Sequence, residues 1–152
     1  MWASFISSNG INVDGECVQV PRQDNTAICT FTNASETAPY QDYKISVKQP
    51  GKITKLFEQT YAITVPGHVF FSNGGRLVVF EFAEEGHPQY WIYATADVLK
   101  GNIDDMVYYF ERYELKYIES LNDDGTLVFA VQCHEQGEDT CKEQLNIYTA
   151  QK

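Results

Sequence analysis

The composition is that of a folded globular protein, because apolar residues make up 43% and aromatic residues 14% of the 152-residue chain. This length suits one domain with its own core, so we expect a single domain over residues 1–152. No run approaches the roughly 18–20 consecutive apolar residues of a membrane span. The formal charge of −10 also disfavours nucleic acids and anionic membranes as partners.

The first predicted element is a hairpin closed by a polar turn. In CVQVPRQDNTAIC, residues 17–20 and 27–31 read as two short strands around Arg22-Gln23-Asp24-Asn25. Folding the segment about this turn places Cys17 opposite Cys29. Cross-strand neighbours have Cβ atoms about 4.5–5.5 Å apart, close to the separation in a disulfide. We therefore predict a Cys17–Cys29 disulfide.

The central part of the chain alternates apolar and polar residues between turns. YKISVKQ predicts a strand that ends at Pro50-Gly51, KITKLFEQT fits either a strand or a short helical turn, and YAITV is interrupted by Pro66-Gly67. HVFFSNGGRLVVFEF is the clearest hairpin, because Asn73-Gly74 suits the positive-φ positions of a tight turn. EFAEEGHPQYWIYATA predicts a second hairpin connected through residues 85–88.

One segment has helical rather than strand periodicity. Asn102 is a favourable N-cap, and Asp104 and Asp105 would lie in the first turn, where the helix dipole favours acids. Apolar side chains at helical spacing would share one face: Met106, Val107, Phe110 and Tyr113. We predict one short helix near residues 103–113.

Two further hairpins are expected after this helix. KYIESLNDDGTLVFAVQ turns at residues 123–125, and CHEQGEDTC turns at Gly137, which brings Cys133 opposite Cys141. A zinc site with His134 is the alternative, but structural zinc sites usually place their cysteines two to four residues apart. The Cys-x-x-Cys spacing of redox motifs is also absent. We predict a second disulfide, no metal site and no cofactor.

The expected fold is mainly β, an antiparallel meander in which strands pair with their sequence neighbours. With about nine or ten strands, the sheet should split into a sandwich or curl into a partly open barrel. The helix near residues 103–113 completes this expectation, and an α+β arrangement is the alternative. Two local disulfides indicate an oxidising compartment, so we expect a periplasmic or secreted protein. Residues 1–10 lack signal-peptide features, so this assignment requires a signal sequence absent from this chain.

The negative charge is confined to the second half of the sequence. Residues 1–76 carry six basic and six acidic residues, whereas residues 77–152 carry five basic and fifteen acidic residues. Many of these acids fall at predicted turns or the helix start: Glu84-Glu85, Asp104-Asp105, Asp123-Asp124, Glu135, Glu138 and Asp139. Alternate turns of a meander emerge at the same end of the sheet, so several acidic pairs should converge there. Such a surface would speed encounter with a basic partner.

The sequence carries no motif of a known catalytic site, so we expect a binding protein rather than an enzyme. Three groups of residues form the predicted partner-binding surface: the small-residue tip of the clearest hairpin, the acidic turns, and His87 with an aromatic anchor. They are Ser72, Asn73, Gly74, Gly75, Arg76, Glu84, Glu85, His87, Tyr90, Asp123 and Asp124. The tip has little bulk and, by expectation, exposed backbone donors.

Two hypotheses of function follow. The first is an inhibitor that occludes the active site of a basic enzyme, in its most specific form a bacterial immunity protein against a secreted peptidoglycan hydrolase. Enzymes that act on anionic peptidoglycan tend to be cationic, so an acidic, disulfide-bonded inhibitor suits them. The alternative is a small-ligand carrier built as a β-barrel of lipocalin type, although the Gly-x-Trp motif near the first strand is absent.

Overall fold

A computed structural model describes residues 4–6, 12–34, 40–84, 87–133 and 140–150. Most of these residues form strands, which pair into three antiparallel sheets. The first sheet has the order β1-β2-β3-β4-β5. Its strands are β1 (Ser4–Ile6), β2 (Asn12–Gln19), β3 (Ala27–Ala34), β4 (Gln41–Gln49) and β5 (Lys52–Ala62). KITKLFEQT, which fitted a strand or a helical turn, is thus a strand.

The second and third sheets continue the same meander. The second sheet contains β6 (Val65–Phe71), β7 (Leu77–Glu84), β8 (His87–Ala94) and β9 (Tyr108–Phe110), with the helix α1 (Thr95–Leu99) between β8 and β9. The third sheet contains β10 (Leu115–Leu121), β11 (Thr126–Gln132) and β12 (Thr140–Asn146). Every strand pairs with its sequence neighbours within its sheet, so the predicted mainly β, sandwich-like meander is confirmed.

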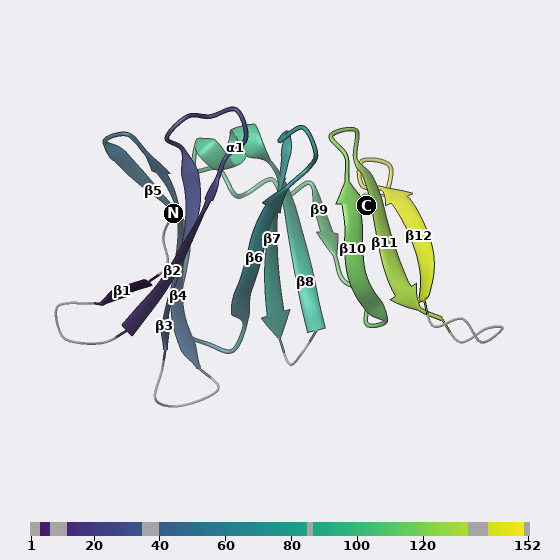
Figure 1. Cartoon of the computed structure of the whole chain (residues 1–152), viewed down its shortest axis with the longest axis horizontal. Helices are drawn as coiled ribbons and strands as arrows, with labels where there is room; N and C mark the ends of the chain where they lie inside the picture. Colours follow the sequence, from purple (N-terminus) through teal and green to yellow (C-terminus); the bar gives the residue numbers. More distant parts are fainter. Residues whose placement is uncertain (1–3, 7–11, 35–39, 85–86, 134–139, 151–152) are drawn as a thin grey trace.

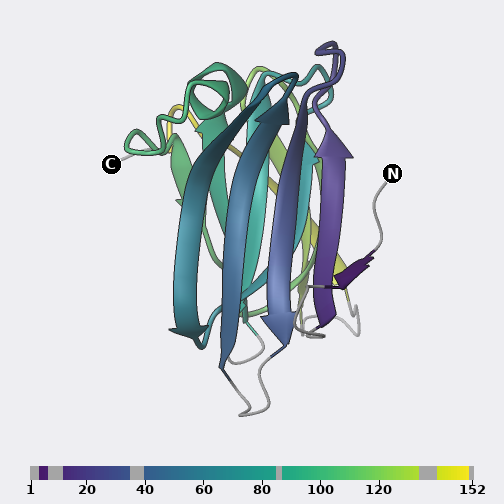
Figure 2. The same cartoon turned by 90° about the vertical axis from the view of Figure 1, so that its left-hand side faces the viewer.

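The three sheets stack as successive layers across the molecule (Figure 1). Figure 2 looks onto the first sheet, behind which the other two lie. Among the described residues, no helix is long and apolar enough to cross a membrane.

The second sheet is buried on both faces, and its sequence explains why. Successive side chains of a strand point to opposite faces, and β7 contains an uninterrupted apolar run from Leu77 to Phe80. Val78 and Phe80 enter the core shared with the first sheet, whereas Leu77 and Val79 enter the core shared with the third sheet. A strand covered on both faces needs apolar residues at consecutive positions, and β7 supplies them.

Both predicted disulfides are present. Cys17 and Cys29 are directly opposite each other in the β2–β3 pair, and a disulfide joins them. A second disulfide joins Cys133 to Cys141 at the start of β12. Folding each segment about its turn therefore predicted both pairings correctly.

The predicted position of the helix is wrong. The helix α1 spans Thr95–Leu99 and has Lys100 as its C-cap. Gly101 follows the C-cap, and its φ of +81° suits a residue without a side chain. Within residues 103–113, the chain forms β9, which pairs with the edge of β8. Phe110 is opposite Tyr90 and is buried in the second core. The backbone of β8 gains a hydrogen-bonded neighbour this way, and this long-range pairing outweighs the local helical spacing.

The connection predicted between β7 and β8, residues 85–88, is also longer than the one observed. His87 and Pro88 belong to β8, where they are opposite Glu84 and Ala83. Only residues 85–86 are left to connect the strands, and they lie outside the described residues. Pro88 lacks a backbone donor, but it is near the end of the strand, where proline is tolerated.

The double burial of the second sheet predicts that substitutions on either face are costly. Phe80 and Ile92 are fully buried in different cores. We expect Phe80→Ala to lower the free energy of unfolding by about 3–5 kcal/mol and Ile92→Ala by about 2–5 kcal/mol, because each leaves a cavity. Ile53, which is 68% exposed, is the control, and Ile53→Ala should change stability by less than about 0.5 kcal/mol. Urea unfolding measures all three; a small effect at Phe80 or Ile92 would contradict burial of that face.

Candidate functional site

The structure brings together two of the predicted binding segments. The β6–β7 turn at residues 72–76, α1 and the β10–β11 turn at residues 122–125 all lie at the upper end of the sheets in Figure 1. The predicted tip therefore meets Asp123, which is about 50 residues away in sequence. This end of the molecule is the candidate site.

Asp123 holds the two turns together. Its Oδ1 atom accepts hydrogen bonds from the Ser72 hydroxyl, from the Gly74 backbone N–H at 3.1 Å and from the Arg76 backbone N–H at 3.2 Å. A side chain on Gly74 would collide with the Asp123 carboxylate. The expectation that the tip carries exposed backbone donors is therefore wrong for Gly74 and Arg76, whose N–H groups bind this carboxylate.

Asn73 completes the junction from the other side. The Asp123 backbone N–H donates to Asn73 Oδ1 at 3.1 Å, and the Asn73 N–H donates to the Leu121 carbonyl at 3.0 Å. The remaining tip donor, the Gly75 N–H, bonds the Ser72 carbonyl at 2.9 Å. The turn therefore joins the second sheet to the third, and the Arg76 side chain remains exposed.

Hydrogen bonds keep both aspartates of this turn ionised. The hydrogen bond from the Ser72 hydroxyl, assisted by the two backbone N–H groups, lowers the pKa of Asp123. The pKa of Asp124 is lowered chiefly because its carboxylate accepts the Thr126 backbone N–H at 2.9 Å. Two fixed negative charges therefore mark this turn at neutral pH.

Three more aspartates lie at the same end, on α1 and on the loop that follows it. We call the set the upper acidic surface: Asp97, Asp104, Asp105, Asp123 and Asp124. None of the five forms a salt bridge with another described residue. By contrast, Glu119 on the third sheet is paired with Lys142. The pairs Asp104-Asp105 and Asp123-Asp124 therefore lie at the same end of the sheets.

A groove of about 430 Å³ is found at the same end. All three layers contribute to it, through the β2–β3 turn, the start of α1 and the segment after β12. Its lining includes Gly75 and Arg76 of the predicted tip, the buried Thr95, and Tyr148, which is 46% exposed. Neither Thr95 nor Tyr148 was expected from the sequence, because the four segments that line the groove are separated along the chain.

The other predicted binding residues lie elsewhere. Tyr90 is only 6% exposed in the second core, and its hydroxyl donates to Glu81 Oε2 at 3.0 Å. Burial, and then the nearby Glu81 carboxylate, raise the pKa of Tyr90. Tyr90 is therefore a core residue and not a surface anchor, because the third sheet covers the face on which it lies.

His87 lies at the opposite, lower end of β8, where its ring packs edge-on against Tyr113 with centroids 4.4 Å apart. The side chain of Glu84 and all of Glu85 lie outside the described residues. The same holds for His134, Glu135, Glu138 and Asp139. The predicted surface is thus divided between the two ends of the molecule.

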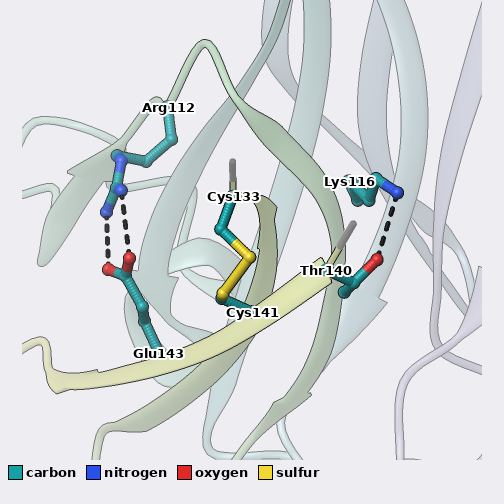
Figure 3. The surroundings of a disulfide bond; sticks show 6 residues. All are labelled: Arg112, Lys116, Cys133, Thr140, Cys141 and Glu143. Atoms are coloured by element: carbon teal, nitrogen blue, oxygen red, sulfur yellow. Dashed lines mark hydrogen bonds and ion pairs between the residues drawn. A yellow bond between two sulfur atoms is a disulfide. The ribbon is translucent and has the colours of Figure 1, made fainter. Parts of the chain in front are cut away.

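The second disulfide closes the lower end of the third sheet (Figure 3). Arg112 reaches from the β9–β10 connection to Glu143 on β12, with Nη1 and Oε1 3.1 Å apart. The guanidinium also lies over the Phe129 ring, 5.4 Å from its centroid. Lys116 donates to the Thr140 hydroxyl at 3.0 Å. Because Cys133 and Cys141 are bonded to each other, the thiolates required by the alternative zinc site are not available.

Comparisons with protein-family models and with curated proteins found no match for this chain. Among the described residues, no group of three or more His, Cys, Asp or Glu side chains is placed to hold a metal ion. The function is therefore inferred from the geometry and charge of the upper end.

The Asp123 junction predicts a specific dependence of stability on pH. Because the folded-state pKa of Asp123 lies below the ordinary value of 3.8, its ionised form stabilises the fold above that value. This stabilisation is lost as the pH falls through the lower folded-state pKa. We expect Asp123→Asn to be less stable than the wild type at about pH 6, and the difference to shrink below about pH 4.

Urea unfolding between about pH 6 and pH 2.5 measures this difference. Ser72→Ala removes the largest cause of the lowered pKa and should reduce the acid dependence in the same way. Ser120→Ala, an exposed serine on β10, is the matched control and should leave it intact. A difference between Asp123→Asn and the wild type that stays constant over the whole range would contradict this role of Asp123.

Proposed function

We propose that the protein is exported and binds a basic partner protein through its upper acidic surface. The observation that carries this proposal is the set of five aspartates at one end, none in a salt bridge with a described residue, beside a groove of about 430 Å³. In its most specific form, the proposal is a bacterial immunity protein that occludes the active site of a peptidoglycan hydrolase.

The charge and the groove would have separate roles in such a complex. Clustered charges of one sign speed diffusional encounter with an oppositely charged partner, but they add little affinity when exposed to solvent. Affinity comes mostly from a few anchor residues buried in well-packed pockets. A groove bordered by Tyr148 and the Arg76 stem offers such a pocket beside the aspartates. The upper end would thus combine electrostatic attraction of the partner with a groove that can bury one of its anchor side chains.

The disulfides support export. All four cysteines are paired, and each pair closes a short loop. Disulfides of this kind persist in the periplasm and outside the cell, whereas cytosolic thiols are kept reduced. The pairing also leaves no thiol for nucleophilic catalysis, which agrees with a binding role.

The carrier hypothesis loses the architecture on which it depended. It required a β-barrel of lipocalin type, but the described strands form three open sheets with packed cores between them. A barrel cavity for a ligand is therefore absent from the described part of the chain.

Export predicts fully oxidised cysteines in the native protein. Protein taken from its own cells without reductant and denatured in iodoacetamide should show no added mass. After reduction, the same treatment should add four carbamidomethyl groups, one for each cysteine. Four alkylated cysteines before reduction would place the protein in a reducing compartment and remove the basis for export.

The acidic surface predicts fast, salt-sensitive association. Affinity capture from a periplasmic extract at low salt should yield a basic protein, and its association rate should fall steeply between about 0.05 and 0.3 M NaCl. The triple variant Asp97→Asn/Asp104→Asn/Asp105→Asn should lower the association rate constant roughly tenfold at low salt. Surface plasmon resonance measures these rates.

A matched control separates the local surface from net charge. The triple variant Glu16→Gln/Glu58→Gln/Glu114→Gln removes the same number of charges from exposed positions outside the upper end, on β2, on β5 and just before β10. It should change the rate less than about threefold. Equal effects of the two triple variants would show that net charge alone matters and would overturn the assignment of the upper end as the binding surface.

A further inference from the structure

The lower end of the molecule holds a cleft of different chemistry. It has a volume of about 390 Å³ and opens between the first and second sheets, where β5 ends. This volume lies within the range of about 300–1,000 Å³ that is usual for small-molecule sites. Aromatic, amide and small side chains line it, among them Gln59, Tyr61, Phe82, Gln89 and Trp91, and none of the lining side chains is charged. The cleft is therefore suited to a neutral ligand.

Tyr61 at the mouth of this cleft has an unusual backbone. Its φ of +53° is in the left-handed region, which bulky residues rarely adopt. It lies in a β-bulge, because β5 has one more residue than β4 between the Gln59–Tyr43 and Ala62–Gln41 pairs. The Tyr61 N–H donates to Asp42 Oδ1 at 2.9 Å, which holds this conformation.

The ring of Tyr61 has no evident structural use, since the residue is 78% exposed. Glycine is the residue that adopts a left-handed conformation without strain. A strained backbone that presents an exposed aromatic ring beside a cleft is typical of a binding position rather than of a fold requirement. We therefore treat Tyr61 as a candidate stacking platform.

Trp91 contributes a second unusual group. Its indole lines the cleft and packs against Phe82 and Phe57, with ring centroids 4.6 and 5.6 Å away. Its Nε1–H is buried and has no hydrogen-bond acceptor among the described residues. Buried donors are nearly always satisfied in native proteins, so this unsatisfied donor beside the cleft would gain an acceptor if a bound ligand displaced the side chains that cover it.

We propose that this cleft binds a neutral sugar residue of a glycan. The apolar C–H face of a sugar ring stacks on an aromatic ring such as that of Tyr61, and its hydroxyl groups can pair with the amide side chains that line the cleft. If the side chains that cover the Trp91 indole N–H shift on binding, a hydroxyl group can also accept from it. Fatty acids and phosphorylated ligands fit less well, because no cation lines the cleft to bind their anionic groups. The site is independent of the upper acidic surface and of the proposed basic partner.

The test is a titration with uncharged disaccharides. In a Trp2→Phe background, Trp91 is the only tryptophan, so its emission reports on the cleft. We expect a saturable emission change with at least one of N,N′-diacetylchitobiose, cellobiose and maltose, at concentrations up to roughly 10 mM, with a Kd of about 1 mM or lower. Isothermal titration calorimetry checks the same interaction without the fluorescence reporter.

Tyr61→Gly separates binding from folding. It removes the ring and relieves the left-handed strain, so the melting temperature should stay the same or rise, whereas sugar affinity should fall at least tenfold. Tyr61→Phe keeps the ring and should bind within about threefold of the parent. Tyr117→Ala, which removes an exposed tyrosine from the third sheet, is the matched control and should leave sugar affinity unchanged.

Three results would overturn the proposal: no saturable response to any of the disaccharides, equal binding by the parent and Tyr61→Gly, or saturable binding of dodecanoate but not of the sugars. A lower melting temperature of Tyr61→Gly, together with unchanged sugar affinity, would identify Tyr61 as a structural residue. None of these results bears on the upper acidic surface, because the titrations contain no protein partner.

Discussion

The burial of the second sheet on both faces is the constraint on which the rest of the structure depends. Alternate residues of β7 and β8 pack into two separate cores. A charged side chain on either face of these strands would therefore be removed from water. Glu81 illustrates the consequence: its carboxylate accepts hydrogen bonds from Tyr90 and from the His68 backbone N–H. Charged side chains without such partners lie instead in the turns, on the outer faces of the first and third sheets, and at the sheet edges.

This layering makes the turns responsible for more than reversing the chain. The β6–β7 turn must fix the second sheet against the third, and Asp123 does so by accepting three hydrogen bonds from it. Gly75 fits closely against Pro21 of the β2–β3 turn, which fixes the same turn against the first sheet. The β6–β7 and β10–β11 turns therefore form one hydrogen-bonded junction, which presents Asp123 and Asp124.

The parts of the fold that local sequence determines were predictable. The hairpins followed from their turn residues, although the positive φ of the β6–β7 turn is at Gly75 and not at Asn73-Gly74 as predicted. The disulfides followed from cysteines placed symmetrically about the predicted turns. The helix near residues 103–113 was misplaced because Met106, Val107 and Phe110 fit helical spacing, whereas the open edge of β8 decides their conformation. Tyr90 was taken for a surface anchor because alternation within one sheet does not reveal that a further sheet covers the second face.

The site residues also fall into those that local sequence predicts and those that depend on long-range packing. The location of Asp104-Asp105 and Asp123-Asp124 at the same end of the sheets was expected from the order of the turns in a meander. The lower cleft had no signal in the sequence, because the left-handed backbone of Tyr61 depends on its pairing with β4 and on Asp42. The sequence equally gave no indication that the Trp91 indole would lack an acceptor, since that depends on what packs around it.

The separation of the two ends has an electrostatic consequence. Strands of seven or eight residues span about 25 Å at about 3.3 Å per residue. The Debye length at physiological ionic strength is about 8 Å, so the upper aspartates exert little field at the lower cleft through solvent. A neutral ligand there would neither gain nor lose from their charge. The same layered scaffold can therefore hold a charged surface and an uncharged cleft whose binding events are independent of each other.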